Sequence, residues 1–339
     1  MIVIRAHDVN EALPKAIQML QEDTARTIAP RDGQKTLEFS EPVCTVYELP
    51  KQRVLFNAAR NANPFFHLME SLWILRGRAD VKWLAQFNQQ MKAYSDDGLI
   101  FHAPYGYRLR SAHNIDQIEE IIDLLHREHS TRRAVLTIWK PTLDLNVESK
   151  DIPCNDMIFF KIRERRLHMT VCCRSNDLIW GAYGANIVQF SMLQEYIAAM
   201  VGVEVGEYRQ ISDSLHVYVD NPLWAALKDI RPSSADTSVY EKLGANPIPL
   251  IVNPKCWDDE LQQFFIDSEA GIWDPSHFKE PFFRVVALPA HEAWFRHKSG
   301  DTRSALEIIK HHMPHYVDWT IAMVQWLERR LKAKENLNA

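Results

Sequence analysis

The sequence predicts an α+β protein, with a mixed or antiparallel sheet flanked by long helices and a helical C-terminal extension. Short runs of β-branched and aromatic residues alternate irregularly with long apolar helical segments, which is typical of this class. Neither a repeat nor a stretch of linker composition divides the chain. With 339 residues, of which 46% are hydrophobic and 24% charged, the chain is long enough to bury a core without disulfides.

The first part of the chain alternates between helical and extended patterns. Apolar residues recur at helical spacing over residues 10–27, whereas the patterns of 37–39 and 43–47 predict strands. Residues 64–77 form a largely apolar helix. Another helix is predicted after Asn114, because asparagine is a favourable N-cap and isoleucines follow at helical spacing.

The middle of the chain is rich in strands. Residues 134–139 form one apolar run, and two more runs cover 157–163 and 167–173. The charged residues 164–166 separate the last two runs. Such a short connection between two strands predicts an antiparallel hairpin.

The remaining elements are a strongly apolar helix over 187–201 and a short strand over 215–219. The tail over 302–332 has the apolar spacing of a helix, with an interruption near Pro314. We therefore expect the chain to end in helices that extend the α+β core.

Composition excludes several classes of function. The formal net charge of −5 gives no overall cationic field for a nucleic acid or an anionic membrane. We expect no membrane span, and the N-terminus lacks a signal peptide, so a cytoplasmic protein is predicted. The five cysteines contain no CxxC pair, and neighbouring His311 and His312 point to different helix faces, so no metal site is predicted.

Cys154 is the candidate nucleophile. It follows a proline at a junction between a loop and a strand, whereas Cys172 and Cys173 lie within a strand. Arg174, at the end of the partner strand, is placed to stabilise a thiolate. The alternative is that Cys154 is a small buried apolar residue.

Three further groups carry functional candidates. Arg132 and Arg133 are either a solvated pair or phosphate ligands, for which arginine forks are well suited. His216 and Tyr218 lie on one side of a strand, within reach of one ligand hydroxyl, or else are core residues. Glu70 lies in an apolar helix, where burial would raise its pKa and suit it for acid–base catalysis.

The order of these motifs resembles the thymidylate synthase family, which includes pyrimidine nucleotide hydroxymethylases. Cys154 and the hairpin are followed by Arg174-Ser175-Asn176-Asp177, a glycine turn, an apolar helix and Ser214-Leu215-His216-Val217-Tyr218. Upstream, the family's arginine loop, E-L-L-W-F-L-x-G helix, V-Y-G-x segment and D-S-R-R pair are matched by segments at Arg31, Glu70–Gly77, Pro104–Tyr107 and Ser130–Arg133. The resemblance spans residues 15–220.

The resemblance implies a catalytic core over residues 1–225, with 226–339 as the C-terminal part of the same domain. It implies that the Cys154 thiolate adds to C6 of a pyrimidine nucleoside monophosphate, which makes C5 a nucleophile towards 5,10-methylenetetrahydrofolate. Arg174, Ser175 and Arg31 are implied to bind the 5′-phosphate, with Arg132 and Arg133 arriving from the partner of an obligate homodimer. The implied roles of the remaining residues are ribose binding by His216 and Tyr218, proton transfer by Glu70 and Tyr105, and binding of the folate pterin by Asp177.

Three departures from thymidylate synthases favour a hydroxymethylase. Met91 stands where synthases have a tryptophan that shields the methylene intermediate, and Asn155 replaces the usual histidine after the nucleophile. The chain also lacks the apolar C-terminal ending that closes synthases over the folate. A methylene intermediate that water can reach is hydrated to hydroxymethyl rather than reduced to methyl.

The base remains open between uracil and cytosine. An ungapped count places Ala185 at the base-pairing position, and Asn186 would serve if the preceding turn were one residue longer. An asparagine accepts uracil or, with its amide flipped, cytosine. The alternatives are a thymidylate synthase proper, a Cys154–His216 hydrolase, and a nucleotide-binding relative without catalysis.

Overall fold

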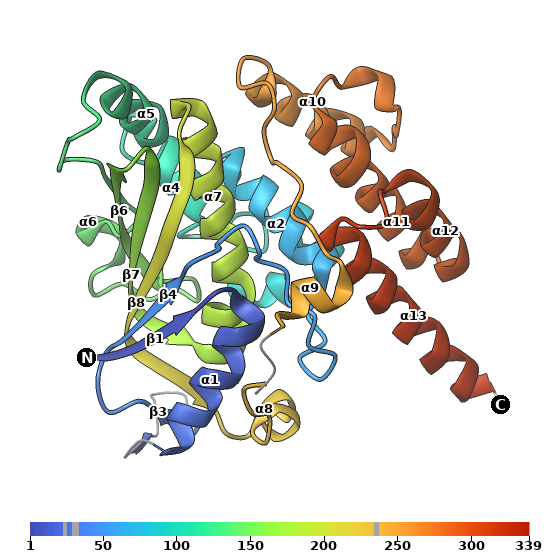
Figure 1. Cartoon of the computed structure of the whole chain (residues 1–339), viewed down its shortest axis with the longest axis horizontal. Coiled ribbons are helices and arrows are strands. Elements are labelled where there is room, and N and C mark those ends of the chain that lie inside the picture. Colours follow the sequence, from blue (N-terminus) through green and yellow to red (C-terminus); the bar gives the residue numbers. More distant parts are fainter. Residues whose placement is uncertain (23–25, 29–33, 234–236, 339) are drawn as a thin grey trace.

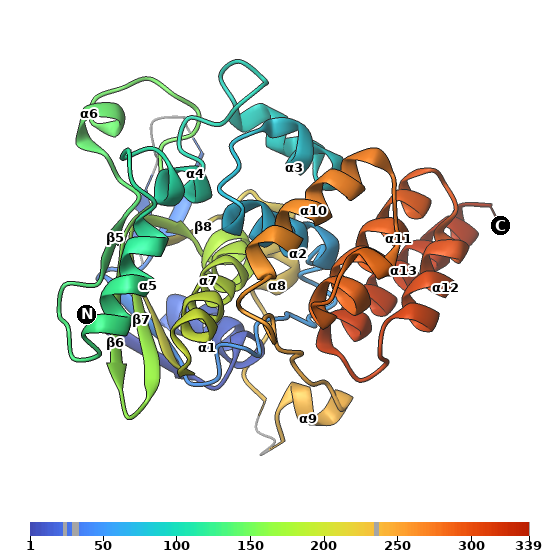
Figure 2. The same ribbon diagram turned by 90° about the horizontal axis from the view of Figure 1, so that it is seen from above.

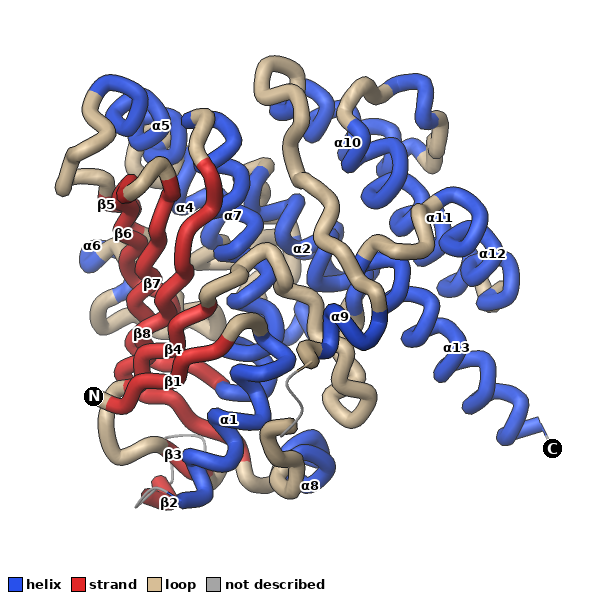
Figure 3. Tube along the Cα trace, viewed as in Figure 1, coloured by secondary structure: helices blue, strands red, loops and turns tan. Residues whose placement is uncertain are grey.

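A layer of strands lies against a larger layer of helices (Figures 1 and 3). The computed structural model describes residues 1–22, 26–28, 34–233 and 237–338. The main sheet has the order β1-β4-β8-β7-β6-β5, and β3 pairs with both β2 and β8. The strands are β1 (Ile2–Ala6), β2 (Arg26–Ile28), β3 (Thr36–Glu38), β4 (Val43–Tyr47), β5 (Val135–Thr137), β6 (Asn155–Arg163), β7 (Arg166–Asp177) and β8 (Glu204–Tyr218).

The sheet is mixed, as predicted. The pairs β1–β4 and β7–β8 are parallel, whereas β4–β8, β3–β8, β6–β7 and β5–β6 are antiparallel. The predicted hairpin is present as β6 and β7, and its turn is formed by Glu164 and Arg165, which both have positive φ angles. This hairpin brings the start of β6, directly after Cys154, beside Cys173 near the end of β7.

Two buried helices connect the sheet to the rest of the molecule (Figure 2). All side chains of α2 (Pro64–Leu75) are buried, and so are nearly all of those of α7 (Asn186–Val201). The other helices of this half are α1 (Val9–Glu22), α3 (Val81–Phe87), the 3₁₀ helix η1 (Gln89–Tyr94), α4 (Tyr105–Arg110), α5 (Gln117–Arg127), α6 (Pro141–Asp144), the π-helical η2 (Leu178–Ala185) and α8 (Pro222–Leu227).

The C-terminal part is helical, as the sequence predicts, and packs against α2. It contains α9 (Val239–Leu243), α10 (Trp257–Ala270), η3 (Pro275–His277), η4 (Phe283–Ala287), α11 (Leu288–Lys298), α12 (Thr302–His312) and α13 (Asp318–Asn338). Aromatic contacts connect the two parts: His291 stacks on Trp83, and both Trp294 and Trp326 contact Phe65. Of the helices described, none combines the length and apolar character that crossing a bilayer requires.

Several predicted boundaries were wrong. The first helix ends at Glu22, and the short strand at 215–219 is the end of the 15-residue strand β8. Asn114 is not an N-cap, because it has a positive φ, and Asp116 caps α5 by accepting from the backbone N–H groups of Ile118 and Glu119. The predicted interruption near Pro314 is confirmed by the break between α12 and α13.

Candidate functional site

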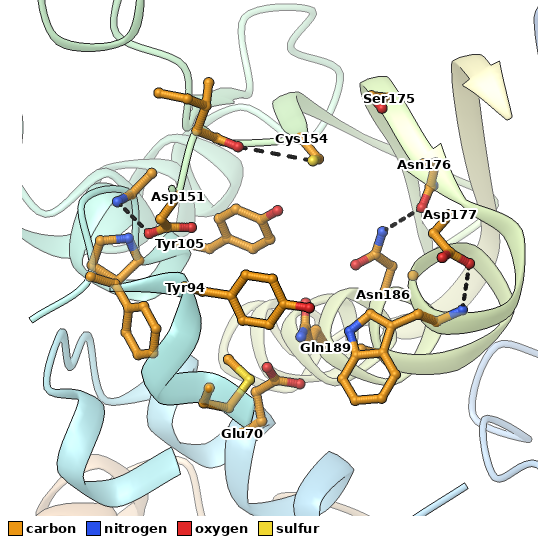
Figure 4. Close-up of a pocket in the computed structure, with 18 of the residues that line it drawn as sticks. Glu70, Tyr94, Tyr105, Asp151, Cys154, Ser175, Asn176, Asp177, Asn186 and Gln189 are labelled. Carbon is orange, nitrogen blue, oxygen red and sulfur yellow. Dashed lines mark hydrogen bonds between the residues drawn. The ribbon is translucent and has the colours of Figure 1, made fainter. Parts of the chain in front are cut away.

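A cavity of about 440 Å³ opens between α2, η1, α4, the loop before β6, and the segment from the end of β7 to α7 (Figure 4). The described part of the chain brings eight of the predicted site residues together in its lining. They are Glu70, Tyr105, Cys154, Arg174, Ser175, Asp177, Asn186 and Tyr218. None of the described residues after Tyr218 lines the cavity.

The hairpin places Arg174 against the loop that carries Cys154. The Arg174 Nε donates to the carbonyl of Pro153 at 2.8 Å, and its Nη2 donates to that of Ile152 at 3.2 Å. These two bonds hold Nη2 at 4.0 Å from the Cys154 Sγ. The cation is therefore fixed beside the thiol, as the sequence predicts.

The thiol is nevertheless stabilised in its neutral form. Burial raises the pKa of Cys154, and the carboxylates of Asp151, Asp156 and Asp177 raise it further, whereas Arg174 lowers it. Burial and three carboxylates outweigh one guanidinium. Arg174 alone therefore does not ionise the Cys154 thiol completely, contrary to the expectation from the sequence.

Glu70 projects from α2 into the cavity, as Figure 4 shows. Burial raises its pKa to about 7, and a hydrogen bond from Gln189 opposes this effect. Within the described residues, neither Glu70 Oε2 nor Gln189 Oε1 has a hydrogen-bond partner, although both atoms are buried. Buried acceptors of this kind need a donor, so this part of the cavity suits a water molecule or a polar substrate.

Tyr105, on α4, contacts the cavity as a neutral phenol. Burial raises its pKa well above the ordinary value. The Asn155 Nδ2 donates to its hydroxyl at 3.0 Å. Asn155 thus occupies the position after the nucleophile as a fully buried partner of Tyr105.

Asn186 reaches the cavity because the preceding segment is π-helical. The η2 turn, whose N-cap is Asp177, accommodates one more residue per turn than an α-helix would. A longer turn of this kind is what Asn186 would require in order to take the base-pairing position, and that role stays a prediction. Its Nδ2 donates to Asn176 Oδ1 at 3.1 Å, and Ala185 also lines the cavity.

The predicted phosphate and ribose ligands fall into three groups. Ser175 and Tyr218 line the cavity, and His216 lies next to Tyr218 with ring centroids 5.4 Å apart. Arg132 and Arg133 are exposed outside the cavity, where Arg133 pairs with Glu128 at 3.0 Å. Arg31 lies outside the described residues.

The predicted absence of a metal site stays a prediction. Over residues 1–22, 26–28, 34–233 and 237–338, no group of three or more histidine, cysteine or carboxylate side chains is arranged to hold a metal ion.

Sequence reasoning missed several polar residues of the cavity, of which three bear on its chemistry. Gln189 lies one helical turn after Asn186 on α7, and this spacing would have been a usable signal. Asn176 lies between Ser175 and Asp177 and was not assigned a role. Asp151, whose carboxylate accepts from the backbone N–H of Ala103 at 2.7 Å, had no sequence signal.

A cysteine, a fixed arginine and a buried carboxylate around one cavity are typical of an enzyme site. Residues 15–232 match the family model described as thymidylate synthase, which covers well over half of the chain. The chain therefore belongs to the thymidylate synthase family, and it is a one-carbon transferase.

Individual proteins of this family are similar to the chain over most of its length. The deoxyuridylate hydroxymethyltransferase of Pseudomonas phage M6 is 44% identical over 99% of this chain and 96% of its own length. The enzyme of the same name from Bacillus phage SP01 is 35% identical over 90% of this chain and 81% of its own length. The crystal structure of thymidylate synthase from T4 phage matches with a TM-score of 0.54 at 20% identity, over 66% of this chain and 81% of that chain.

These comparisons confirm the predicted family, the α+β fold and the hydroxymethylase type of one-carbon transferase.

Proposed function

We propose that the protein converts dUMP to 5-hydroxymethyl-dUMP, with 5,10-methylenetetrahydrofolate as the one-carbon donor and tetrahydrofolate as the second product. The identity of the nucleotide is supported by the two phage relatives named deoxyuridylate hydroxymethyltransferase. The reaction is supported by the residues that surround the cavity, taken in the order in which they act.

In the first step the Cys154 thiol gives its proton to water in the open cavity, and the thiolate, stabilised by Arg174, adds to C6 of the pyrimidine. The negative charge delocalises from C5 onto O4, so C5 becomes a carbon nucleophile. Arg174, held by the carbonyls of Ile152 and Pro153, is placed to bind the 5′-phosphate together with Ser175 and Arg31. His216 and Tyr218 bind the ribose 3′-hydroxyl.

In the second step C5 attacks the methylene carbon of the folate, whose pterin is bound by Asp177. The C5 proton is then taken up by a water molecule that is hydrogen-bonded to the neutral Tyr105 hydroxyl. The bond between the methylene carbon and the folate nitrogen breaks, and Glu70 assists protonation at that nitrogen. This releases tetrahydrofolate and leaves an exocyclic methylene on a base still bound to Cys154.

In the third step water adds to the methylene carbon, Cys154 leaves C6, and the 5,6 double bond is restored. The observation that carries the proposal is the pair of buried acceptors, Glu70 Oε2 and Gln189 Oε1, which lack a partner among the described residues. A water that donates to both would present a lone pair to the methylene. With a pKa of about 7, Glu70 is suited to take the proton of this water.

Two further features support access of water to the intermediate. Met91, where synthases have tryptophan, lines the cavity and is a flexible side chain that shields less. The C-terminal helix α13 packs against α2 and α12, and its described residues do not line the cavity.

We also propose that the active form is a homodimer in which Arg132 and Arg133 reach the partner's phosphate site. Both side chains are exposed and lie outside the cavity of their own chain. The sheet carries exposed apolar side chains on β6, where Met157 is 40% and Phe159 is 39% exposed. Such a surface is suited to burial against a second copy.

Product analysis tests the proposal. The protein is incubated with 5,10-methylenetetrahydrofolate and, in separate reactions, with dUMP, dCMP or CMP, and the products are identified by mass spectrometry. A Cys154→Ser variant prepared in the same way gives the background. We expect 5-hydroxymethyl-dUMP and tetrahydrofolate. A methyl product with dihydrofolate would identify a thymidylate synthase instead, and full turnover by the variant would exclude covalent catalysis.

A further inference from the structure

A continuous series of side-chain hydrogen bonds runs along the wall of the cavity. It starts at Tyr105, whose hydroxyl accepts from Asn155 Nδ2 at 3.0 Å. The Cys173 thiol donates to Asn155 Oδ1 at 2.6 Å, and its sulfur accepts from Asn176 Nδ2 at 3.6 Å. Asn176 Oδ1 then accepts from Asn186 Nδ2 at 3.1 Å, and this last bond is visible in Figure 4.

These hydrogen bonds give the side-chain amide of Asn176 a defined orientation. Its Nδ2 donates to Ser212 Oγ at 3.1 Å as well as to the Cys173 sulfur. With both donors used on that side, the carbonyl oxygen is the end that faces Asn186. Asn186 must therefore turn its own Nδ2 towards Asn176, which leaves its Oδ1 on the other side of the amide.

Close packing keeps Asn176 in this orientation. Asn176, Cys173 and Ser212 are each at most 3% exposed. Gly181 of η2 passes so close that a Cβ atom on it would lie 2.5 Å from Asn176 Oδ1. Only a glycine leaves room for the carbonyl here, and reversing the Asn176 amide alone would set its Nδ2 against the Nδ2 of Asn186.

The direction of the Asn186 amide matters because uracil and cytosine differ in the groups they present. Uracil has a donor at N3 and an acceptor at O4, whereas cytosine has an acceptor at N3 and a donor at N4. An amide that rotates freely satisfies either base by exchanging its ends, but a fixed amide satisfies only one.

We propose that Asn176 is a positioning residue that fixes the amide of Asn186 and thereby commits the cavity to uracil over cytosine. This inference rests on the proposed function for its choice of base. Although Asn176 lines the cavity, the role assigned to it here acts only through the amide of Asn186.

The test compares dUMP with dCMP, in binding to the free protein by calorimetry and in kcat/KM with 5,10-methylenetetrahydrofolate. Asn176→Ala removes the acceptor that orients Asn186, so the preference for dUMP should fall by about tenfold or more. Asn176→Asp is the matched control. It keeps an acceptor facing Asn186, so it should retain most of the preference.

A preference in Asn176→Ala that stays within twofold of the wild type, in a protein with an unchanged circular dichroism spectrum, would overturn the inference. If this variant does not fold, Ser212→Ala replaces it. This change removes one of the two groups that hold the Asn176 Nδ2, so the preference should fall about threefold. An unchanged preference would again overturn the inference.

Different results would contradict the proposed function and the proposed role of Asn176. Absence of a hydroxymethyl product would contradict the proposed function, whereas the binding preference does not require turnover. A wild-type protein that forms the product from dUMP but binds dUMP and dCMP equally would contradict only the role of Asn176.

Discussion

The buried glutamate of the cavity and those of the C-terminal part differ in how completely their carboxylates are hydrogen-bonded. Glu280 is fully buried, and its carboxylate accepts from the backbone N–H groups of Val252 and Asn253 at 2.9 and 2.8 Å. Glu260 likewise accepts from the N–H groups of Lys279 and Glu280. Glu70 is also buried, but one of its oxygens lacks a partner among the described residues. Backbone donors make the first two structural, whereas the open acceptor of Glu70 is available for chemistry.

Asp318 shows that a shifted pKa alone does not identify a catalytic group. Burial raises its pKa to about 7, the same value as for Glu70. Its carboxylate, however, accepts from the Tyr240 hydroxyl at 3.2 Å and from the backbone N–H of Trp319 at 2.8 Å. These hydrogen bonds connect α9 with the start of α13, so Asp318 has a structural role despite its raised pKa. The distinction between the two regions lies in unsatisfied hydrogen-bonding capacity next to a cavity.

The largest expected effect on turnover comes from Cys154→Ser. Serine is a far poorer nucleophile towards C6, so formation of hydroxymethyl nucleotide should fall on the order of 10⁴-fold or more. The thermal midpoint should stay near that of the wild type, because the thiol's hydrogen bond to the carbonyl of Ile152 is long, at 3.9 Å. Product assays and differential scanning calorimetry measure the two quantities. Residual activity above about one tenth would contradict the assignment.

Glu70→Gln should reduce turnover while it stabilises the fold. Loss of the general base should lower kcat by about 10²- to 10⁴-fold. Because burial raises the pKa of Glu70 to about 7, the folded protein binds a proton more tightly than the unfolded chain does, and stability falls as the pH rises from about 4.5 to 7.

The glutamine stays neutral, so above pH 7 this variant should be more stable than the wild type by roughly 3 kcal/mol, with no gain at pH 4. Urea unfolding at both pH values measures the difference. An equal change at pH 4 and pH 8 would show that ionisation of Glu70 is not its cause.

Glu280→Gln is the same chemical change made in the other region, and we expect the opposite outcome. The amide would turn its NH2 group towards the N–H of either Val252 or Asn253, which should cost about 2–4 kcal/mol of unfolding free energy. For the folded protein, kcat should stay within about twofold of the wild type. A loss of turnover comparable to that of Glu70→Gln would contradict the purely structural role of Glu280.

Asp318→Asn should have the smallest effect on turnover. The raised pKa of Asp318 makes the folded protein bind a proton more tightly than the unfolded chain, so the stability of the wild type falls as the pH rises from about 4 to 7. In the variant, which has no ionisable group at this position, this fall in stability should be smaller. The pH profile of kcat should stay unchanged, because Asp318 does not line the cavity. A shifted kcat profile would indicate that the C-terminal part takes part in the chemistry.

Local patterns predicted much of the fold and of the site. The β6–β7 hairpin, the apolar helix α7 and the break near Pro314 follow from periodicity and turn residues that lie next to one another in the sequence. The eight predicted residues in the cavity were found because the family motifs are contiguous.

What the sequence did not predict depends on contacts between distant segments. The C-terminal helices have no recognisable motif, and their position depends on packing such as that of His291 on Trp83. Asn176 gained a role only when the fold brought Cys173, Ser212 and Asn186 around it. The π-helical turn of η2, which brings Asn186 to the cavity beside Ala185, also followed from no residue pattern.

Formation of a hydroxymethyl product requires that water reach the methylene intermediate held on Cys154. The most direct measurement is turnover of dUMP with 5,10-methylenetetrahydrofolate in water enriched in oxygen-18, followed by mass spectrometry of the nucleotide. Hydration beside Glu70 and Gln189 predicts that the new hydroxyl carries the heavy isotope in proportion to the enrichment. An unlabelled hydroxymethyl group, or a methyl group with dihydrofolate as the second product, would contradict it.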